Sequence, residues 1–190
     1  ANFLDNNFVK IFIPSSYTYK EIFAWGSHPL LDHMWSTSYL QIIHDGSNVN
    51  RFEKTRFISN FDFVLQNLNV CWEDKTNNIN CGKCEKCQRT MISLSILKKL
   101  EVTDAFPNHI DIKDIKLNSS FLNKPNKYSF TKSLNEELIK IPDIKSRRDL
   151  YNIHKLIFLK LKLFEIRKLT KELLNNFKEF KPNFICIFLL

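Results

Sequence analysis

Four cysteines lie between positions 71 and 87, and they constrain the fold of this chain more than any other feature. Their spacing is Cys71-x9-Cys81-Gly82-x-Cys84-x2-Cys87. A C-x2-C pair lets two sulfurs converge on one ion, and four thiolates complete the tetrahedral coordination of zinc. A closed four-cysteine site has no open position for a substrate, so the spacing predicts a structural zinc ion.

An iron–sulfur cluster is the main alternative to zinc, because C-x2-C-x2-C also opens ferredoxin-type runs. Against a cluster, the fourth cysteine lies upstream and no Cys-Pro follows the motif. The fifth cysteine, Cys186, lies in an apolar run and is interpreted as an ordinary hydrophobic residue. Cysteines grouped in this way indicate metal binding in a reducing compartment rather than disulfides, so we expect a cytoplasmic protein.

The basic charge is concentrated in one segment near the C-terminus. Residues 140–181 contain 12 Lys and Arg against 5 Asp and Glu, whereas the rest of the chain is nearly neutral. We therefore divide the chain into an α/β region at 1–139, which holds the cysteines, and a basic helical extension at 140–190. Such a helix can bind nucleic acid, an anionic membrane surface or a protein partner, or it can be a solvated face of the body. No secretory signal and no run of about 18 apolar residues occurs, so no transmembrane helix is expected.

The apolar pattern predicts an α/β fold. Short apolar runs that end at turn signals predict strands at 8–13, 39–44 and 68–72. Helical spacing predicts a short helix after Pro29 and longer helices at 50–60, 84–100 and 146–180. The segment 157–164 also alternates as a strand would, and that alternative stays open. Two prolines and many Asn residues predict a long irregular connection over 103–130.

The cysteine region resembles the 7-cyano-7-deazaguanine synthases of the PP-loop ATP pyrophosphatase superfamily. The resemblance lies in the order of three parts: a strand that ends in Cys-Trp, a polar loop, and C-G-x-C-x-x-C entering a helix. NRFEKT at 50–55 looks like the segment of these enzymes in which a basic residue and a glutamate open the helix before the cysteine strand. WGSHPLLD at 25–32 and HDG at 44–46 look instead like segments of divergent PP-loop relatives. The resemblance covers about residues 8–100. It implies part of a parallel-sheet nucleotide-binding domain, of the adenine nucleotide alpha hydrolase type, with the zinc near the substrate pocket.

One departure from this family concerns ATP. The superfamily binds ATP through an S-G-G-x-D-S loop, whose backbone N–H groups hold pyrophosphate. No such loop occurs here, and the first glycine is Gly26, which lies past the first predicted strand. Either the ATP-binding half lies upstream of Ala1, which we expect, or this protein has lost it, and ATP and Mg²⁺ bind only if that half is present. The 190 residues are not expected to hydrolyse ATP alone.

The resemblance implies an enzyme that adenylates and modifies a small molecule or a nucleobase. The candidate catalytic residues are His28, Asp32 and His44, and the candidate substrate-binding residues are Ser27, Asp45, Arg51 and Lys54. A histidine can carry a proton near neutral pH, and a basic side chain can neutralise developing phosphate charge. Five of these residues have a structural alternative: His28 and Asp45 in turns, Asp32 at a helix start, and Arg51 and Lys54 on a solvated helix face.

A second class of function also stays open. The chain can be a non-enzymatic, zinc-stabilised module that binds nucleic acid through residues 140–181. Few aromatic residues are interleaved with the basic ones there, which argues against base stacking. A third possibility is a partner that completes another subunit's active site, and a homodimer is also compatible with the sequence.

Overall fold

The computed structural model describes residues 8–24, 26–71, 73, 80–115 and 125–179. The chain forms two compact units, Ala1–His109 and Ile110–Leu190, and each is described by itself. The boundary predicted at 139/140 lies inside the second unit, between its two long helices.

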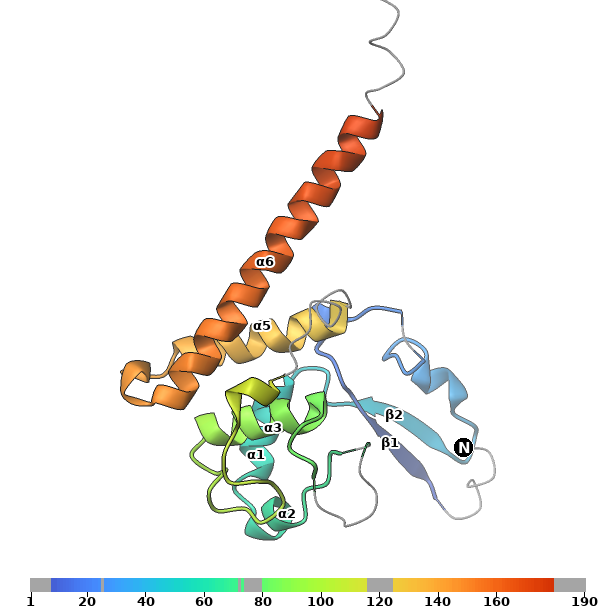
Figure 1. The fold of residues 1–190 in the computed structure, drawn as a ribbon. Helices are drawn as coiled ribbons and strands as arrows, with labels where there is room; N and C mark the ends of the chain where they lie inside the picture. The colour runs from blue at the N-terminus through green and yellow to red at the C-terminus, as the bar shows by residue number, and fades with distance from the viewer. Residues whose placement is uncertain (1–7, 25, 72, 74–79, 116–124, 180–190) are drawn as a thin grey trace, which may run out of the picture. The chain divides into compact units, whose positions relative to one another are not determined.

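The first unit contains a two-stranded parallel sheet (Figure 1). Strand β1 (Lys10–Pro14) pairs with β2 (Gln41–Asp45), and the register runs from Lys10 opposite Gln41 to Pro14 opposite Asp45. Both strands were predicted from the sequence, and both are confirmed. Gly46 follows β2 with a φ of +79°, a conformation that glycine adopts without the strain of a side chain. The chain therefore turns at the carboxyl end of the sheet.

Short helices connect and follow the two strands. Two 3₁₀ helices, η2 (Tyr19–Glu21) and η3 (Asp32–Trp35), lie in the crossover between β1 and β2. After β2, α1 (Arg51–Ile58) begins at Asn50, whose side chain accepts a hydrogen bond from the Glu53 N–H at 2.9 Å and so caps the helix. Helix α2 (Asp62–Gln66) follows directly. The helices predicted at 50–60 and after Pro29 are thus present, in shorter form.

The strand predicted at 68–72 is wrong for the residues that are described there; Trp72 lies outside them. Leu68 to Cys71 have no regular secondary structure. The backbone N–H groups of Val70 and Cys71 donate to the side-chain oxygen of Asn80, at 2.8 and 3.0 Å, instead of to a neighbouring strand. A side chain therefore satisfies the hydrogen bonds that the apolar pattern had suggested for a sheet.

Helix α3 (Glu85–Ile96) supplies much of the core of the first unit. It ends at Ile96, and Lys98, two residues later, adopts a φ of +59°. Cys84 is its N-cap, so the helix predicted at 84–100 is confirmed with later start and earlier end. The buried apolar side chains of this unit are Leu40, Ile42, Phe52, Leu65, Cys84, Cys87, Met91, Ile92, Leu94, Leu100 and Phe106.

The second unit is built on two long helices. Helices α5 (Pro125–Ile139) and α6 (Arg148–Glu179) pack against each other, with η5 (Ile144–Ser146) between them and η4 (Ile112–Asp114) before them. Their core comprises Leu134, Leu138, Leu150, Ile153, Ile157 and Leu161. None of the helices in the described ranges combines the length and the apolar character needed to cross a bilayer.

The two long helices differ in how well the sequence predicted them. The irregular connection predicted over 103–130 is wrong from Pro125 onward, because proline is tolerated at the first position of a helix, where its missing N–H has no partner. The helix predicted at 146–180 is confirmed, and the strand alternative for 157–164 is wrong. Helical spacing prevails there because Ile153, Ile157 and Leu161 all face the core.

Candidate functional site

The four cysteine sulfurs of the first unit lie together as a possible metal site. All four Sγ atoms of Cys71, Cys81, Cys84 and Cys87 lie within 4.8 Å of one another. The Cys71–Cys84 and Cys81–Cys87 sulfur pairs are each 3.9 Å apart. Zinc–sulfur bonds of about 2.3 Å in a regular tetrahedron place sulfurs about 3.8 Å apart, whereas a disulfide needs about 2.05 Å. The cluster therefore fits one tetrahedral metal ion such as zinc, and all four cysteines are free thiols.

The turn after Cys81 depends on Gly82. The Cys84 N–H donates to the Cys81 sulfur at 3.3 Å, which brings the second and third cysteines of the motif together. Gly82 allows this turn with a φ of +68°. A Cβ at this position would lie 2.8 Å from Cγ of Pro107, so both the backbone conformation and the close packing require glycine. Cys87 then lies in the first turn of α3, as the sequence predicted.

Asn80 joins the two halves of the cysteine motif. Its side chain is 2% exposed, and its oxygen accepts from the N–H groups of Val70 and Cys71. Its amide nitrogen donates to the carbonyl oxygens of Leu68 and Ala105, both at 2.7 Å. Four hydrogen bonds from one buried amide hold Cys71 beside Cys81. Sequence analysis missed this residue, although its place directly before Cys81 was the available signal.

Burial of the thiols opposes their ionisation. Burial raises the pKa of the Cys84 and Cys87 thiols, so a divalent cation is needed to favour their thiolate forms. Arg89 has a side chain that is 14% exposed, and its Nη1 lies 3.5 Å from Oε1 of Glu85. Burial, and then the neighbouring Arg51, lower the pKa of Arg89 to about 10, so its guanidinium is charged at neutral pH.

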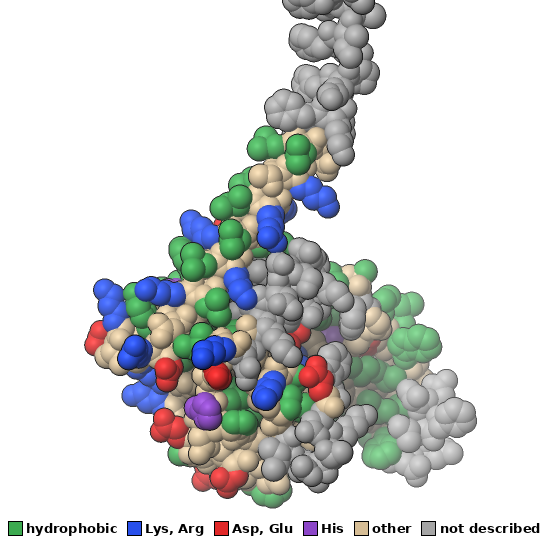
Figure 2. Space-filling model, viewed as in Figure 1, with side chains coloured by type: hydrophobic (Ala, Val, Ile, Leu, Met, Phe, Trp, Pro, Cys, Tyr) green, Lys and Arg blue, Asp and Glu red, His purple; other side chains and the backbone are tan. Residues whose placement is uncertain are grey.

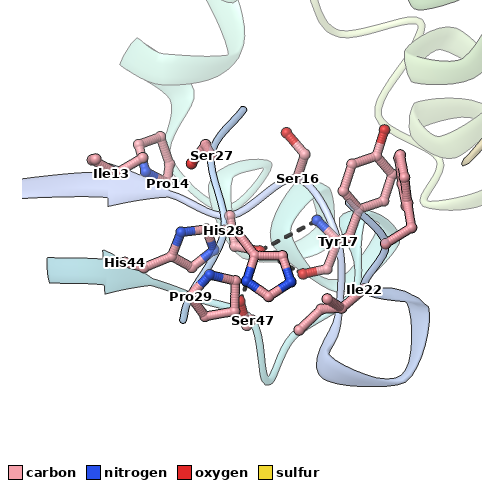
Figure 3. A pocket seen from close by; sticks show the side chains of 12 residues that line it. Ile13, Pro14, Ser16, Tyr17, Ile22, Ser27, His28, Pro29, His44 and Ser47 are labelled. Carbon is pink, nitrogen blue, oxygen red and sulfur yellow. Dashed lines mark hydrogen bonds between the residues drawn. The ribbon is translucent and has the colours of Figure 1, made fainter. Parts of the chain in front are cut away.

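A cavity of about 290 Å³ forms a second candidate site in the first unit (Figure 3). It is lined by residues at the carboxyl ends of both strands and directly after them, together with part of the crossover. Parallel α/β sheets bind ligands outside the carboxyl ends of their strands, which is where this cavity lies. The lining residues are Ile13, Pro14, Ser15, Ser16, Tyr17, Ile22, Phe23, Ser27, His28, Pro29, His44 and Ser47.

Asp32 is the centre of a hydrogen-bond network beside this cavity. One carboxylate oxygen accepts from the Ser27 hydroxyl at 2.7 Å and lies 2.6 Å from Nδ1 of His44, and the other accepts from the His28 N–H at 2.9 Å. Asp32 is 3% exposed. Burial raises its pKa, but the hydrogen bonds from His44, His28 and Ser27 outweigh that effect, so the pKa lies below its usual value. Asp32 is therefore ionised at neutral pH.

The hydrogen bonds give the two cavity histidines opposite tautomers. Because the Asp32 carboxylate only accepts hydrogen bonds, Nδ1 of His44 carries a hydrogen, and Nε2 of the neutral ring is an acceptor. Nδ1 of His28 accepts from the Leu30 N–H at 3.1 Å, so its Nε2 carries the hydrogen. Both rings line the cavity. One histidine can thus accept a proton while the other donates a hydrogen bond.

Ser15 and Lys54 connect the loops that follow the two strands. The Ser15 N–H donates to the Asp45 carbonyl at 2.7 Å, and Ser15 Oγ accepts from the Ser47 hydroxyl at 2.9 Å. Nζ of Lys54 donates to the Ser15 carbonyl at 2.7 Å. Partial burial and the neighbouring Arg51 lower the pKa of Lys54, while Asp45 opposes this. Sequence analysis missed Ser15 and Ser47, since serines after a strand carry no distinctive signal.

The structure thus brings together four of the seven predicted catalytic and substrate-binding residues: Ser27, His28, Asp32 and His44. Asp45 and Arg51 are exposed, and with Lys54 they are not among the residues that line the cavity. Although Arg51 as a whole residue is exposed, partial burial of its guanidinium lowers the pKa of that group, and Tyr17 opposes this effect. The proposed roles of all seven residues stay predictions.

Comparison with protein-family models, curated proteins and solved structures finds no match for this chain. The resemblance to PP-loop enzymes therefore rests on the residues and motifs quoted above. What the structure establishes is a mixed α/β chain with a small parallel sheet and a cluster of four cysteines that could hold a metal ion.

Proposed function

We propose that the first unit is the substrate-side portion of an ATP-dependent enzyme similar to 7-cyano-7-deazaguanine synthase, stabilised by a structural zinc ion. The cavity beside Asp32 binds the small molecule or nucleobase that is adenylated. The cavity volume of about 290 Å³ is at the lower end of the range for ligand pockets, about 300–1,000 Å³. A cavity of this volume suits a small ligand such as a nucleobase. The Ser27–Asp32–His44 network is the observation that carries this proposal.

In this proposal His44 is the proton acceptor. Asp32 orients the ring through Nδ1 and stabilises the imidazolium that forms when Nε2 takes a proton from the attacking nucleophile. His28 donates a hydrogen bond from Nε2 to an oxygen or ring nitrogen of the ligand. The pair provides general acid–base chemistry in one cavity. Pyrophosphate binding would need a glycine-rich loop, which these 190 residues do not contain.

We propose zinc rather than an iron–sulfur cluster at the four cysteines. One ion at about 2.3 Å from each sulfur accounts for sulfur pairs 3.9 Å apart, whereas a cluster distributes its cysteine ligands over separate irons. With four thiolates bound, the ion would have no open position and would stabilise the fold. Elemental analysis tests this: we expect one zinc and no iron per chain, and iron with acid-labile sulfide would reject zinc.

The cavity is tested by ligand binding, because turnover would require ATP-binding residues. Guanine, adenine and AMP serve as probes in saturation-transfer NMR with the full chain. We expect at least one to bind, and His44→Gln to weaken that binding at least tenfold. His33→Gln is the matched control, since His33 is exposed on η3 and does not line the cavity. No binding at millimolar probe, or equal effects of the two variants, would reject the cavity as a nucleobase site.

The adenylation step has a separate test. The coding sequence directly before Ala1 should contain a strand, a glycine-rich loop and a helix. A chain that includes that segment should release pyrophosphate from ATP when a purine that carries a carboxylate is supplied as substrate. If the upstream sequence has no such loop, adenylation by this chain is rejected, while the binding experiment still decides the role of the cavity.

A further inference from the structure

Helix α6 has a second apolar stripe, distinct from the one in the core of its unit. The members of this stripe are spaced alternately three and four residues apart: Leu156, Leu159, Leu163, Ile166, Thr170 and Leu173. Leu163 and Ile166 are each 54% exposed, and every residue from 165 to 175 is exposed. Figure 2 shows hydrophobic side chains gathered along this part of the helix. A contiguous exposed apolar stripe on a helix is typical of an interaction surface.

The spacing of this stripe is that of a coiled-coil seam. In heptad terms, Leu156, Leu163 and Thr170 occupy a positions, and Leu159, Ile166 and Leu173 occupy d positions. Three consecutive a–d pairs present one narrow face of the helix. A polar residue at one a position, here Thr170, is a common way to fix the register of a helical pair.

Basic residues flank the seam. The e and g positions between 155 and 167 are all basic: Lys155, Lys160, Lys162 and Arg167. Figure 2 shows Lys and Arg side chains beside hydrophobic ones along this helix. Nζ of Lys162 lies 5.5 Å from the centre of the Phe158 ring, on the same helix. The acidic residues Glu165 and Glu172 occupy c positions, away from the seam. The flanks therefore carry one sign of charge.

This charge pattern disfavours pairing with a second copy of the chain. In a parallel pair, g residues face e residues of the partner, which would place Lys162 beside Arg167. In an antiparallel pair, g faces g and e faces e, which again joins basic residues. In a partner helix with acidic residues at e and g, each of these positions would instead place an acidic side chain beside a basic one.

The composition of the seam also argues against nucleic acid and against a membrane surface. Its members are aliphatic apart from Thr170, so it offers no aromatic ring for base stacking. Interfacial membrane helices place Trp and Phe with Leu on a broad apolar face. An aliphatic seam with a threonine at one a position, and with exposed Leu169 and Leu174 at the g and e positions beside it, matches a helix partner better than either surface.

We propose that the exposed seam of α6 binds an amphipathic helix of another protein, with acidic residues beside its apolar stripe. The apolar seam supplies the affinity, and the basic flanks supply specificity for an acidic partner. This surface is independent of the function proposed for the cavity.

The test uses the full 190-residue chain and two synthetic four-heptad peptides with Leu at a and d. One peptide has Glu at every e and g position, and the other has Lys. We expect only the Glu peptide to bind in fluorescence anisotropy, with affinity falling as salt rises from 50 to 300 mM. Ile166→Asn should weaken binding at least tenfold, because a polar amide replaces an apolar seam residue.

Lys168→Glu is the matched control, since Lys168 lies at an f position on the outer face, and it should leave binding within twofold. The exposed position of Ile166 means that helicity and melting should stay unchanged in Ile166→Asn. Equal binding of the two peptides, or no effect of Ile166→Asn, would overturn the proposal. So would a dimer in sedimentation velocity, or Ile166-dependent binding to phosphatidylserine vesicles or to poly(U) RNA in place of the Glu peptide.

Discussion

In residues 1–109, loops are held by buried polar side chains and by sulfurs that could share a metal ion, whereas in residues 110–190 two helices are held by aliphatic contacts. The Asn80 side chain makes four hydrogen bonds to backbone groups of the first unit, and Asp32 accepts three more. In the second unit, Leu138, Leu150, Ile153 and Ile157 are nearly or fully buried. The comparison teaches that a loop-rich unit and a helical unit need different sources of stability.

The largest expected effect is loss of the metal. We expect Cys84→Ser to release the ion and unfold the first unit, because binding free energies of about 10–16 kcal/mol at structural zinc sites are folding free energy. All three Trp residues lie before residue 110, so Trp fluorescence reports the first unit, while circular dichroism at 222 nm follows mainly α5 and α6. The fluorescence transition should vanish, and the helical signal should persist.

Cys186→Ser controls for the loss of a thiol as such, and it should retain the metal. If Cys84→Ser keeps its metal content and its fluorescence transition, the four sulfurs do not form a metal site. If the helical signal collapses together with the fluorescence transition, the two units do not fold separately, and the comparison fails.

The second unit should respond to a cavity in its core and not to the metal. Ile153 is 0% exposed, so Ile153→Ala should lower the free energy of unfolding by about 2–5 kcal/mol in the circular dichroism transition. Leu163→Ala, on the exposed seam of the same helix, should change it by less than about 0.5 kcal/mol. Equal effects at the two positions would contradict the observed packing of α6.

Removal of the Asn80 side chain should affect the stability and the metal affinity of the first unit together. Asn80→Ala leaves two N–H groups and two carbonyls without their partner, which we expect to cost about 3 kcal/mol. Metal affinity should fall about 10–100-fold, since Cys71 loses its support. Competition with a zinc chelator measures the affinity. Asn69→Ala, at an exposed neighbouring position, is the control, and an equal loss there would show that Asn80 has no special role.

The smallest expected effect is a pH dependence at Asp32. Its folded pKa lies below the usual value, so its contribution to stability is present above about pH 4 and is lost as pH falls through the folded pKa. Asp32→Asn should cost about 1–2 kcal/mol at pH 7 and progressively less in acid. Urea unfolding followed by Trp fluorescence at pH 7 and pH 3 measures this. A difference between the two proteins that grows in acid would reverse the inferred sign.

Predictions from the sequence succeeded where a local pattern was sufficient. The strands that end at Pro14 and Asp45 and the helices that begin near Arg51, Glu85 and Arg148 were all found from apolar spacing and turn residues. Helix α5 was missed because Pro125 was interpreted as part of a loop, although proline also begins helices. The strand expected at 68–72 was wrong because a side chain, Asn80, takes the hydrogen bonds of that segment.

By itself, the sequence determined the four-cysteine cluster, because the spacing of thiols and the glycine between them leave few other arrangements. It also placed the basic charge in the C-terminal helix. Only the tertiary structure decided that Asp32 lies between Ser27 and His44, that Asn80 supports Cys71, and that one stripe of α6 is packed while the other is exposed. These outcomes depend on contacts between residues that are distant along the chain. Periodicity and spacing give information only on residues that are close together in the sequence.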